Sequence, residues 1–544
     1  MTRRDLLALV GAALLAVLHT WPLASSPASL SRLDNADTAL NTWIVSWVAH
    51  ALPRAPLAVF DAPIFYPERR TLAYSEPLLA PGVMAMPLRA AGLSASTTYN
   101  LLAMAGLALS AWAMWRVVTD WTGDPAAGAV AGMAFAFNAH LLTRFAHLQA
   151  LHAEFVPLVL LAVDRIARQP RVRDGVLLGV AIALVGLVSL YQLAFVAGAT
   201  VVGLLARRCD WRGAGRRTFA VALLGAAVSV VLLTPVLWQY LTVSREFGIT
   251  RSLEETARYG ATWRDYLATG GRVHYALWSA SYFQGAAALF PGVTVVALAF
   301  AGAWSRRADR GRVRMCVAIA VLGVAMSLGP ALPFYEWLYH AVPLLQATRV
   351  AARWGFLALT ALAVLAGFGA AAVRAGVSPR AGLAVALLAP LAVTLEALRA
   401  PIAYTPTPPV PAIYRQIAAL PDAVLLEYPL FPGSNFNLNA PYLVAQTEHF
   451  HPIVAGYSGL YTQAFADRVA DLSRFPDEAA QTRIRALGVT HVVFHLEPLR
   501  ASFGQDAVDA VDAVPWLERV LADETARVFR VKREALAGTD AGGR

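Results

Sequence analysis

Two acidic residues stand where a polar stretch, 34–76, begins after the first apolar segment of the chain. Asp34 and Asp37 are three residues apart. A carboxylate here can act as a general base that takes the proton of an attacking hydroxyl. Asp37 also precedes a helical pattern, so the alternative is that it only caps a helix. Asp37 and Asp34 are the candidate catalytic residues, and Glu76 is a candidate substrate-binding residue that could equally be a solvated side chain.

The aromatic residues of this stretch recur at helical spacing. Trp43 and Trp47 share one face of the pattern with Leu40, Ile44 and Val48. The pattern predicts an interfacial helix whose indoles lie at the depth of the lipid headgroups. The following residues, 60–81, contain Pro67 and Pro77, which predict an irregular surface segment.

A second set of polar residues lies further along the chain, at spacings that fit one stripe of a single helix: His140, Arg144, His147, Leu151 and Glu154. Ionisable groups this close to a membrane usually face a cavity or the protein interior. His147 and Glu154 are therefore candidate substrate-binding residues, with structural polarity as the alternative. The two histidines are seven residues apart and form no HExxH-like pair, so no metal ligand is assigned, although a divalent metal stays open.

Arginines interleaved with aromatic residues suggest a site for a phosphate group. Arg245 and Arg258 lie in a predicted long loop, 238–285, and Arg349 and Arg353 lie four residues apart before an apolar run. Guanidinium groups pair bidentately with phosphate. These four arginines are candidate substrate-binding residues. The alternatives are a loop that lies on anionic lipid, for the first pair, and snorkelling at the interface, for the second.

The composition requires a membrane. Of 544 residues, 58% are hydrophobic and 15% are charged, and the mean hydropathy is +0.53, too apolar for one soluble domain. The net charge of +10 comes largely from arginines in short runs between apolar segments. That distribution is a topology signal and gives no reason to expect a nucleic acid partner. The two cysteines provide no disulfide framework.

Apolar runs of about 20 residues predict roughly eleven transmembrane helices. They lie near 6–24, 97–119, 124–139, 148–164, 174–190, 192–206, 218–237, 286–304, 313–329, 352–371 and 381–398. We expect the first to be retained as a helix, although it could be a cleaved signal peptide. The arginine runs fall on one side of this arrangement, which the positive-inside rule makes cytoplasmic. The opening loop, 25–96, the loop 238–285 and the tail after Pro401 then lie outside.

The tail changes character at about residue 401. A proline-rich linker precedes a short helical pattern at 412–420 and three strand candidates at 423–430, 489–496 and 526–534. The predicted fold is therefore an α-helical polytopic membrane domain, 1–400, with a small extracytoplasmic α/β domain at 401–544.

Several phrases together resemble the GT-C superfamily of integral membrane glycosyltransferases that use polyprenyl-phosphate-linked sugars, and most closely its bacterial members. The phrases are the acids before Trp43 and Trp47, IFYPERRTLAYSEPLL, RFAHLQ before Glu154, LFPG at Leu289–Gly292, LLQATRVAARWGF around Arg349, and LEYPLF, VAGYSG and FPDEAAQTRIRALGVTHVVFH in the tail. The resemblance implies a GT-C-like fold and a catalytic base in the first outer loop, carried here onto Asp37. Many members have two adjacent acids there, whereas Asp34 and Asp37 are three apart.

The resulting hypothesis is an inverting glycosyltransferase of the bacterial cytoplasmic membrane. It would move a sugar from a polyprenyl-phosphate donor to a glycan, lipid or protein acceptor of the cell envelope, at the outer face and with no assigned cofactor. The alternative is a non-catalytic protein that binds or flips a lipid-linked glycan, or that assists envelope assembly. The near absence of charges at the centre of the predicted spans favours chemistry at the surface over passage through the middle.

Overall fold

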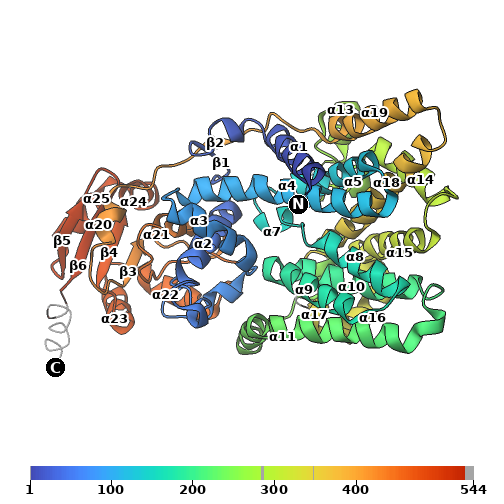
Figure 1. The fold of residues 1–544 in the computed structure, drawn as a ribbon. Coiled ribbons are helices and arrows are strands. Elements are labelled where there is room, and N and C mark those ends of the chain that lie inside the picture. Colours follow the sequence, from blue (N-terminus) through green and yellow to red (C-terminus); the bar gives the residue numbers. More distant parts are fainter. Residues whose placement is uncertain (1, 284–286, 347, 533, 535–544) are drawn as a thin grey trace. The chain divides into compact units, whose positions relative to one another are not determined.

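A computed structural model of the protein describes residues 2–283, 287–346, 348–532 and 534. The chain forms two compact units, each assembled from two separate stretches (Figure 1). Unit 1 comprises Met1–Pro27 and Asn100–Tyr404, and unit 2 comprises Ala28–Tyr99 and Thr405–Arg544. The opening loop predicted at 25–96 thus belongs largely to the same unit as the tail. Parts of three predicted segments lie outside the described residues, namely 284–285 of the loop 238–285, 286 of the span 286–304, and 533 and 535–544 of the tail.

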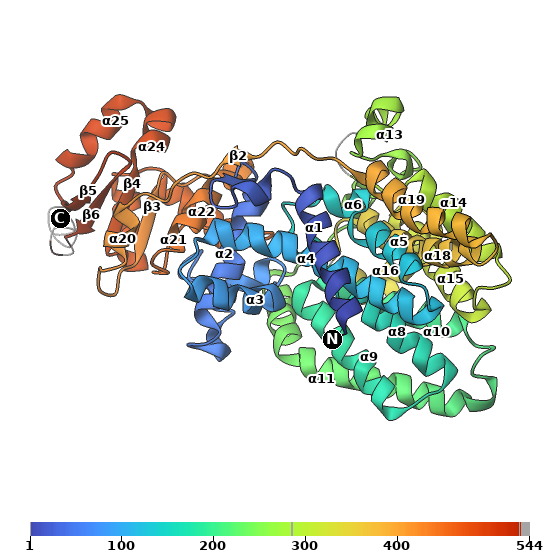
Figure 2. The same ribbon diagram turned by 45° about the horizontal axis from the view of Figure 1, so that its top comes forward.

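Unit 1 is built of helices (Figures 1 and 2). They are α1 (Arg3–His19), α4 (Ala95–Thr122), α5 (Pro125–Ala136), α6 (Ala139–Leu142), α7 (Leu148–Leu151), α8 (Val156–Arg168), α9 (Val172–Val188), α10 (Leu190–Ala206), α11 (Gly215–Phe247), α12 (Leu253–Arg258), α13 (Arg272–Leu277), α14 (Val293–Trp304), α15 (Arg310–Ser327), α16 (Pro333–Ala341), α17 (Pro343–Gln346), α18 (Gly355–Arg374) and α19 (Pro379–Ala397).

Five helical stretches of the described residues are long and apolar enough to cross a membrane. They are Ala95–Thr122, Pro125–Leu142, Gly215–Phe247, Ala351–Arg374 and Pro379–Ala397. The protein is therefore a multi-pass membrane protein. Every predicted span overlaps a helix. Some of these helices, such as Leu190–Ala206 and Val293–Trp304, are apolar but shorter than the five named above. The predicted loop 238–285 begins too early, because α11 continues to Phe247.

Glycines let several of these helices approach closely. A Cβ atom at Gly369 on α18 would collide with the backbone of Leu298 on α14, and one at Gly302 on α14 would collide with that of Leu365. On α9, Gly175 and Gly179 meet the backbone of α11 in the same way. Small residues at helix contacts are the usual means of packing in a membrane, where apolar side chains gain little by leaving lipid.

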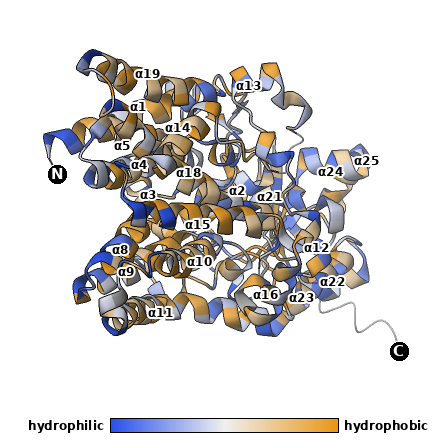
Figure 3. Cartoon of the chain, turned by 90° about the vertical axis from the view of Figure 1, so that its right-hand side faces the viewer, coloured by the Kyte–Doolittle hydropathy of each residue, from blue (hydrophilic) through white to orange (hydrophobic). Residues whose placement is uncertain are grey.

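A buried carboxylate joins three helices at one end of unit 1. Asp164 of α8 is 2% exposed and pairs with Arg207, itself 1% exposed at the end of α10, and with Arg312 of α15 at 2.9 Å. It also accepts from Arg168 at 3.2 Å, and Arg168 reaches Asp309 at 2.6 Å. In Figure 3 the ends of α8 and α9 on the left-hand side are hydrophilic, next to largely hydrophobic helices. Arg168, Arg207 and Arg312, from three of the arginine runs, meet here, and the assignment of this end to the cytoplasm stays a prediction.

Unit 2 contains a four-stranded mixed sheet. Its order is β3 (Leu425–Tyr428), β4 (His491–His495), β6 (Ala526–Val531) and β5 (Leu517–Ala522), with β3 and β4 parallel and the other pairs antiparallel. The three predicted strands are β3, β4 and β6. A two-stranded sheet pairs β1 (Leu30–Ser31) with β2 (Thr405–Pro406). The helices are α2 (Ala36–Ala51), α3 (Leu79–Ala90), α20 (Ile413–Ile417), α21 (Ala440–Gln446), α22 (Gln463–Leu472), α23 (Glu478–Leu487), α24 (Leu496–Phe503) and α25 (Gln505–Ala510).

The helix predicted around Trp43 and Trp47 is α2, but its indoles contact protein in place of lipid headgroups. Helix α2 packs on α3 and α21, and Trp43 is 1% exposed. The Trp43 indole donates to Gln446 at 2.6 Å, and that of Trp47 donates to the Val59 carbonyl at 2.8 Å. A tryptophan needs one polar partner when it is buried, and here the protein supplies it in place of lipid headgroups.

The segment 60–81 is irregular, as predicted, but it does not lie on the surface. Phe65 and Tyr66 donate backbone hydrogen bonds to Ala455 and Ile453 at 3.0 Å, and Phe65 is completely buried. Glu68 accepts from Tyr74 at 2.6 Å and pairs with Arg468. The segment is therefore part of the core of unit 2, because its apolar residues have a protein partner in the tail.

Replacing Asp164 should destabilise unit 1 strongly. The Asp164→Ala variant takes the shared carboxylate away from Arg207 and Arg312 and leaves the buried Arg207 with Asp210 alone, and removing one partner from a buried ion network costs about 3–5 kcal/mol. The Asp309→Ala variant removes the exposed partner of Arg168 and the N-cap of α15, and should cost about 0.5–2 kcal/mol. Thermal unfolding of both purified variants in detergent measures the difference, and equal melting temperatures would contradict the role of Asp164.

Candidate functional site

Asp37 lies in the first turn of α2, where hydrogen bonds hold both its backbone and its carboxylate. Its backbone N–H donates to Asn35 at 2.9 Å, its carbonyl accepts from Asn41 at 2.7 Å, and its Oδ1 accepts from the hydroxyl of Tyr457 at 2.9 Å. The cap of the helix is therefore Asn35, and the alternative role of Asp37 as the cap is excluded. The half-buried carboxylate is left oriented at the positive end of a helix, where negative charge is favoured.

The two other acids of the opening stretch have different surroundings. Asp34 is exposed and pairs with Arg32 at 3.1 Å. Glu76 is half-buried, in the extended segment that precedes α3. The Asp37 carboxylate is fixed by a contact from the distant tail, Tyr457.

Arginines of unit 1 gather around Tyr191, in the first turn of α10. The Tyr191 hydroxyl accepts from the backbone N–H of Arg349 at 2.9 Å. The guanidinium of Arg353 lies over the Tyr191 ring, 4.5 Å from its centroid, and that of Arg349 lies 5.2 Å from the centroid of Tyr259. Arg349 is also 3.9 Å from Glu255, a loose and partly exposed ion pair. The structure thus brings together the predicted Arg349 and Arg353, and we call the group they form with Arg144, His147 and Tyr191 the cationic cluster.

Arg144 and His147 belong to this cluster because the charges of its arginines act on both residues. Burial, followed by the positive charges of Arg353, Arg144 and Arg349, lowers the pKa of His147 to about 3. Burial and Arg353 lower the pKa of Arg144 to about 9, so Arg144 stays charged at neutral pH. Three guanidinium groups therefore act on one neutral histidine, which is the arrangement expected around a site for an anion.

The predicted single stripe from His140 to Glu154 is wrong. The chain leaves the helical conformation at 143–147 and again at 152–155, between α6, α7 and α8. Pro157 lies in the first turn of α8 and lacks the N–H that a continuous helix would need there. His147 reaches the cationic cluster, whereas Glu154 pairs with His152 at 2.9 Å.

The His152–Glu154 pair belongs to a buried polar group next to the cluster. Gln192, which follows Tyr191, donates to the carbonyls of Gln149 at 2.6 Å and His152 at 3.4 Å. His152 Nε2, Glu154 Oε2 and Gln192 Oε1 are buried and have no hydrogen-bond partner in the described part of the chain. Several such atoms in one place indicate room for water or for ligand hydroxyls.

The remaining two predicted arginines lie at helix ends in unit 1. Arg245 lies in the last turn of α11, and Arg258 is the last residue of α12. Both side chains are exposed. Within the described residues, no three His, Cys, Asp or Glu side chains are grouped so that they could hold a metal ion.

The sequence analysis missed the residues that position the Asp37 carboxylate and the cationic cluster. Tyr191 carries no local signal, since its contact with Arg349 spans 158 positions. His152 was passed over because the helical stripe selected His147. Tyr457 lies in the tail phrase VAGYSG, and nothing local marks its contact with Asp37, which spans 420 positions.

The fold is similar to that of GT-C glycosyltransferases over nearly the whole chain, as the sequence predicted. The arabinofuranosyltransferase AftD from Mycobacteria superposes with a TM-score of 0.63 at 16% identity, over 98% of this chain and 40% of its own. The chain therefore spans less than half the length of AftD.

Two further solved structures match more loosely. ArnT from Cupriavidus metallidurans, in the apo state, gives a TM-score of 0.46 at 16% identity, over 97% of this chain and 98% of its own. The archaeal oligosaccharyltransferase AglB from Archaeoglobus fulgidus, in complex with an inhibitory peptide and a dolichol-phosphate, gives 0.43 at 13% identity, over 93% and 71%. No family model and no curated protein matches the sequence.

Removing the Tyr191 hydroxyl should loosen the segment that carries Arg349. In the Tyr191→Phe variant the N–H groups of Arg349 and Val350 lose their shared acceptor, and the loss of such a hydrogen bond costs about 0.5–1.5 kcal/mol. Limited proteolysis around residue 349 and thermal unfolding measure the effect. The Tyr259→Phe variant keeps the ring beneath Arg349 and should behave like the wild type; equal behaviour of the two variants would contradict the role of Tyr191.

Proposed function

We propose that the protein is an inverting glycosyltransferase that moves a sugar from a polyprenyl-phosphate donor to a hydroxyl acceptor of the cell envelope. The observation that carries the proposal is the cationic cluster of Arg144, Arg349 and Arg353 in a membrane unit whose fold is that of GT-C glycosyltransferases. AftD, with which the fold is shared, is an arabinofuranosyltransferase. In this proposal the reaction takes place at the outer face of the cytoplasmic membrane, and unit 2 is extracytoplasmic.

The acceptor hydroxyl needs a base, and Asp37 is the residue that we assign to this role. The hydroxyl oxygen attacks the anomeric carbon, and its proton passes to the Asp37 carboxylate as the new glycosidic bond forms. The N-terminus of α2 favours the ionised form that a base requires. The Tyr457 hydroxyl donates to one oxygen of the carboxylate, and this hydrogen bond fixes the orientation of the carboxylate group. Asp34 is the second candidate, but its carboxylate is exposed and already forms an ion pair with Arg32.

The leaving group is a phosphate, and its charge must be met as the bond to the sugar breaks. The anomeric carbon–oxygen bond breaks toward the polyprenyl phosphate, which takes both electrons and leaves as an anion. Fixed guanidinium groups stabilise charge that develops in the transition state. Arg353 is held over the Tyr191 ring and has no carboxylate partner among the described residues, so its charge is available to the phosphate. The apolar tail of such a donor is compatible with the lipid-facing helices of unit 1.

The proposal predicts that Asp37→Asn abolishes most of the turnover. Loss of a general base lowers kcat by about 10²–10⁴-fold. Sugar transfer from polyprenyl-phosphate donors by purified protein, together with a donor-binding measurement, is the test. The Tyr457→Phe variant should keep part of the activity, because the carboxylate stays in place but loses the hydrogen bond that orients it.

Two comparisons make this test specific. The Asp467→Asn variant applies the same chemical change to an exposed acid of α22 and should keep wild-type turnover. The Asp34→Asn variant distinguishes the two candidate acids, and a loss confined to it would transfer the role of base to Asp34. Donor binding without turnover by the wild type, over a range of donors and acceptors, would instead support a protein that binds or flips a lipid-linked glycan.

Arg353 should act on the chemical step more than on folding. The Arg353→Gln variant should lower kcat/KM by about 10²–10³-fold, as for removal of one donor from a charge-stabilising site, and Arg353→Lys should recover part of the loss. The control is Arg264→Gln, which removes another arginine that lies over an aromatic ring, 5.7 Å from the centroid of Trp263. Equal activity of Arg353→Gln and the wild type would remove Arg353 from the mechanism.

A further inference from the structure

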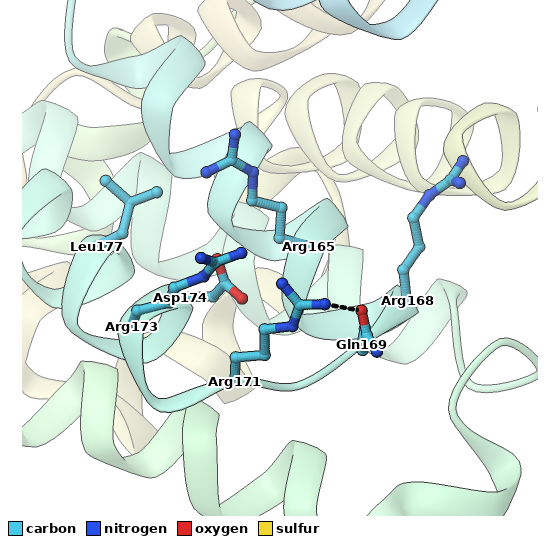
Figure 4. Close-up of a pocket in the computed structure, with 7 residues that line it drawn as sticks. All are labelled: Arg165, Arg168, Gln169, Arg171, Arg173, Asp174 and Leu177. Atoms are coloured by element: carbon cyan, nitrogen blue, oxygen red, sulfur yellow. Dashed lines mark hydrogen bonds between the residues drawn. The ribbon is translucent and has the colours of Figure 1, made fainter.

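A cavity lined by arginines lies where α8 ends and α9 begins, apart from the residues assigned above. Its volume is about 590 Å³, and its lining comprises Arg165, Arg168, Gln169, Arg171, Arg173, Asp174 and Leu177 (Figure 4). In Figure 4 the side chains of Arg165, Arg171 and Arg173 gather around this space, while Arg168 stands to one side. The single acid of the lining, Asp174, is 3% exposed.

The arginines of this cavity differ in whether a carboxylate pairs with them. Arg168 pairs with Asp164 and Asp309. Within the residues that the structure describes, no carboxylate pairs with Arg165, Arg171 or Arg173, although the side chain of Arg171 contacts the Gln169 amide. Three positive charges thus lie around one hollow without a paired carboxylate among the described residues.

Helix stabilisation explains only one of these three charges. Arg165 lies in the last turn of α8, where a cation complements the helix dipole. Arg171 precedes the first turn of α9 and Arg173 lies within it, where the dipole disfavours a cation. An anion in the cavity would satisfy all three, because phosphate pairs well with several guanidinium groups.

The exposed surface of α9 indicates which molecule carries the anion. Val172, Val176 and Val180 lie at intervals of four residues and are 66%, 41% and 37% exposed. They form an apolar stripe along α9 that starts at the cavity and continues for two turns. A free phosphate ion has no apolar part that could contact this stripe. A phospholipid has one, because its acyl chains lie next to its headgroup.

We propose that this cavity binds an anionic phospholipid, with its phosphate among Arg165, Arg171 and Arg173 and an acyl chain along Val172, Val176 and Val180. Basic pockets at the boundary of transmembrane helices select anionic headgroups because each guanidinium near the membrane surface adds to the attraction. The site would fix one lipid against α8 and α9, independently of the proposed transfer reaction.

The test measures lipid binding by the full-length protein in detergent, with phosphatidylglycerol as the probe and native mass spectrometry as the readout. The wild type should bind phosphatidylglycerol in preference to phosphatidylcholine. Each single variant, Arg171→Gln or Arg173→Gln, should lower the affinity about fivefold, which corresponds to the attraction of one charge near the surface. The triple variant Arg165→Gln, Arg171→Gln, Arg173→Gln should abolish the preference, with a melting temperature close to that of the wild type.

A matched variant separates a site from general attraction. Arg208→Gln, Arg306→Gln, Arg380→Gln removes three exposed arginines from helix ends of unit 1 outside the cavity. It should keep the binding of the wild type, and an equal loss in the two triple variants would overturn the proposal.

The apolar stripe provides a second, independent readout. Val176→Asn and Val180→Asn should weaken the binding of phosphatidylglycerol while leaving the arginines intact. Inorganic phosphate should compete only at concentrations far above those of the lipid. If phosphate binds as tightly as the lipid and the valine variants have no effect, the cavity is a site for a free anion and the proposal of a lipid is wrong.

Discussion

The ion network around Asp164 is the interaction on which unit 1 depends. One carboxylate, almost completely removed from solvent, holds the end of α8 against the ends of α10 and α15 through Arg207 and Arg312. A buried charge is costly unless it is fully paired, so such a network tolerates little movement of the helices that carry it. It fixes the start of the α8–α9 connection on one side and, through α10, the turn that presents Tyr191 on the other. The cationic cluster thus owes its geometry to charges at a different end of the same helices.

Unit 2 depends on a different constraint, which is the covering of α2. This helix has buried residues on nearly all of its faces, and two stretches far apart in the sequence provide the cover. Trp43 donates to Gln446 within the helix α21, and Ala39 packs with Ala440 and Val444. Asp37 is thereby placed by the tail, through Tyr457, as much as by its own loop. The small domain contributes to the orientation of the candidate base, which an isolated domain attached by a linker could not do.

Local patterns were sufficient for most of the helices and for part of the sheet. Long apolar runs are specific to membrane spans, and β3, β4 and β6 combine apolar residues with clear breaks on either side. The strand β5 escaped notice because it lies at the edge of the sheet, with Glu518 and Arg519 exposed, and an edge strand needs no apolar alternation. The spacing of the tryptophans in α2 is compatible with a helix that faces lipid and with a helix that is covered by protein. The hydrogen bond from Trp43 to Gln446 shows that protein covers it.

The candidate site was less accessible from the sequence for a physical reason. Residue types alone selected Asp37, Arg349 and Arg353, because acids and paired arginines near a membrane are uncommon. Which acid is oriented, and what the arginines rest on, depends on Tyr457 and Tyr191, whose contacts span hundreds of residues. The helical spacing that linked His147 to Glu154 failed because Pro157 and the breaks around α7 interrupt the helix.

The construction of unit 2 from two stretches has a consequence for biosynthesis. Ribosomes deliver the chain from its N-terminus, so 28–99 emerges long before 405–544, and all of 100–404 is made in the interval. During that time the surfaces of Trp43 and Ala39 that α21 later covers have no partner, and exposed apolar surface in a waiting segment invites aggregation or premature degradation. Folding of this unit is therefore governed by contacts of very long range, which are slow to form. The residues of unit 1 that lie between the two stretches are synthesised before the last part of the chain can close over α2.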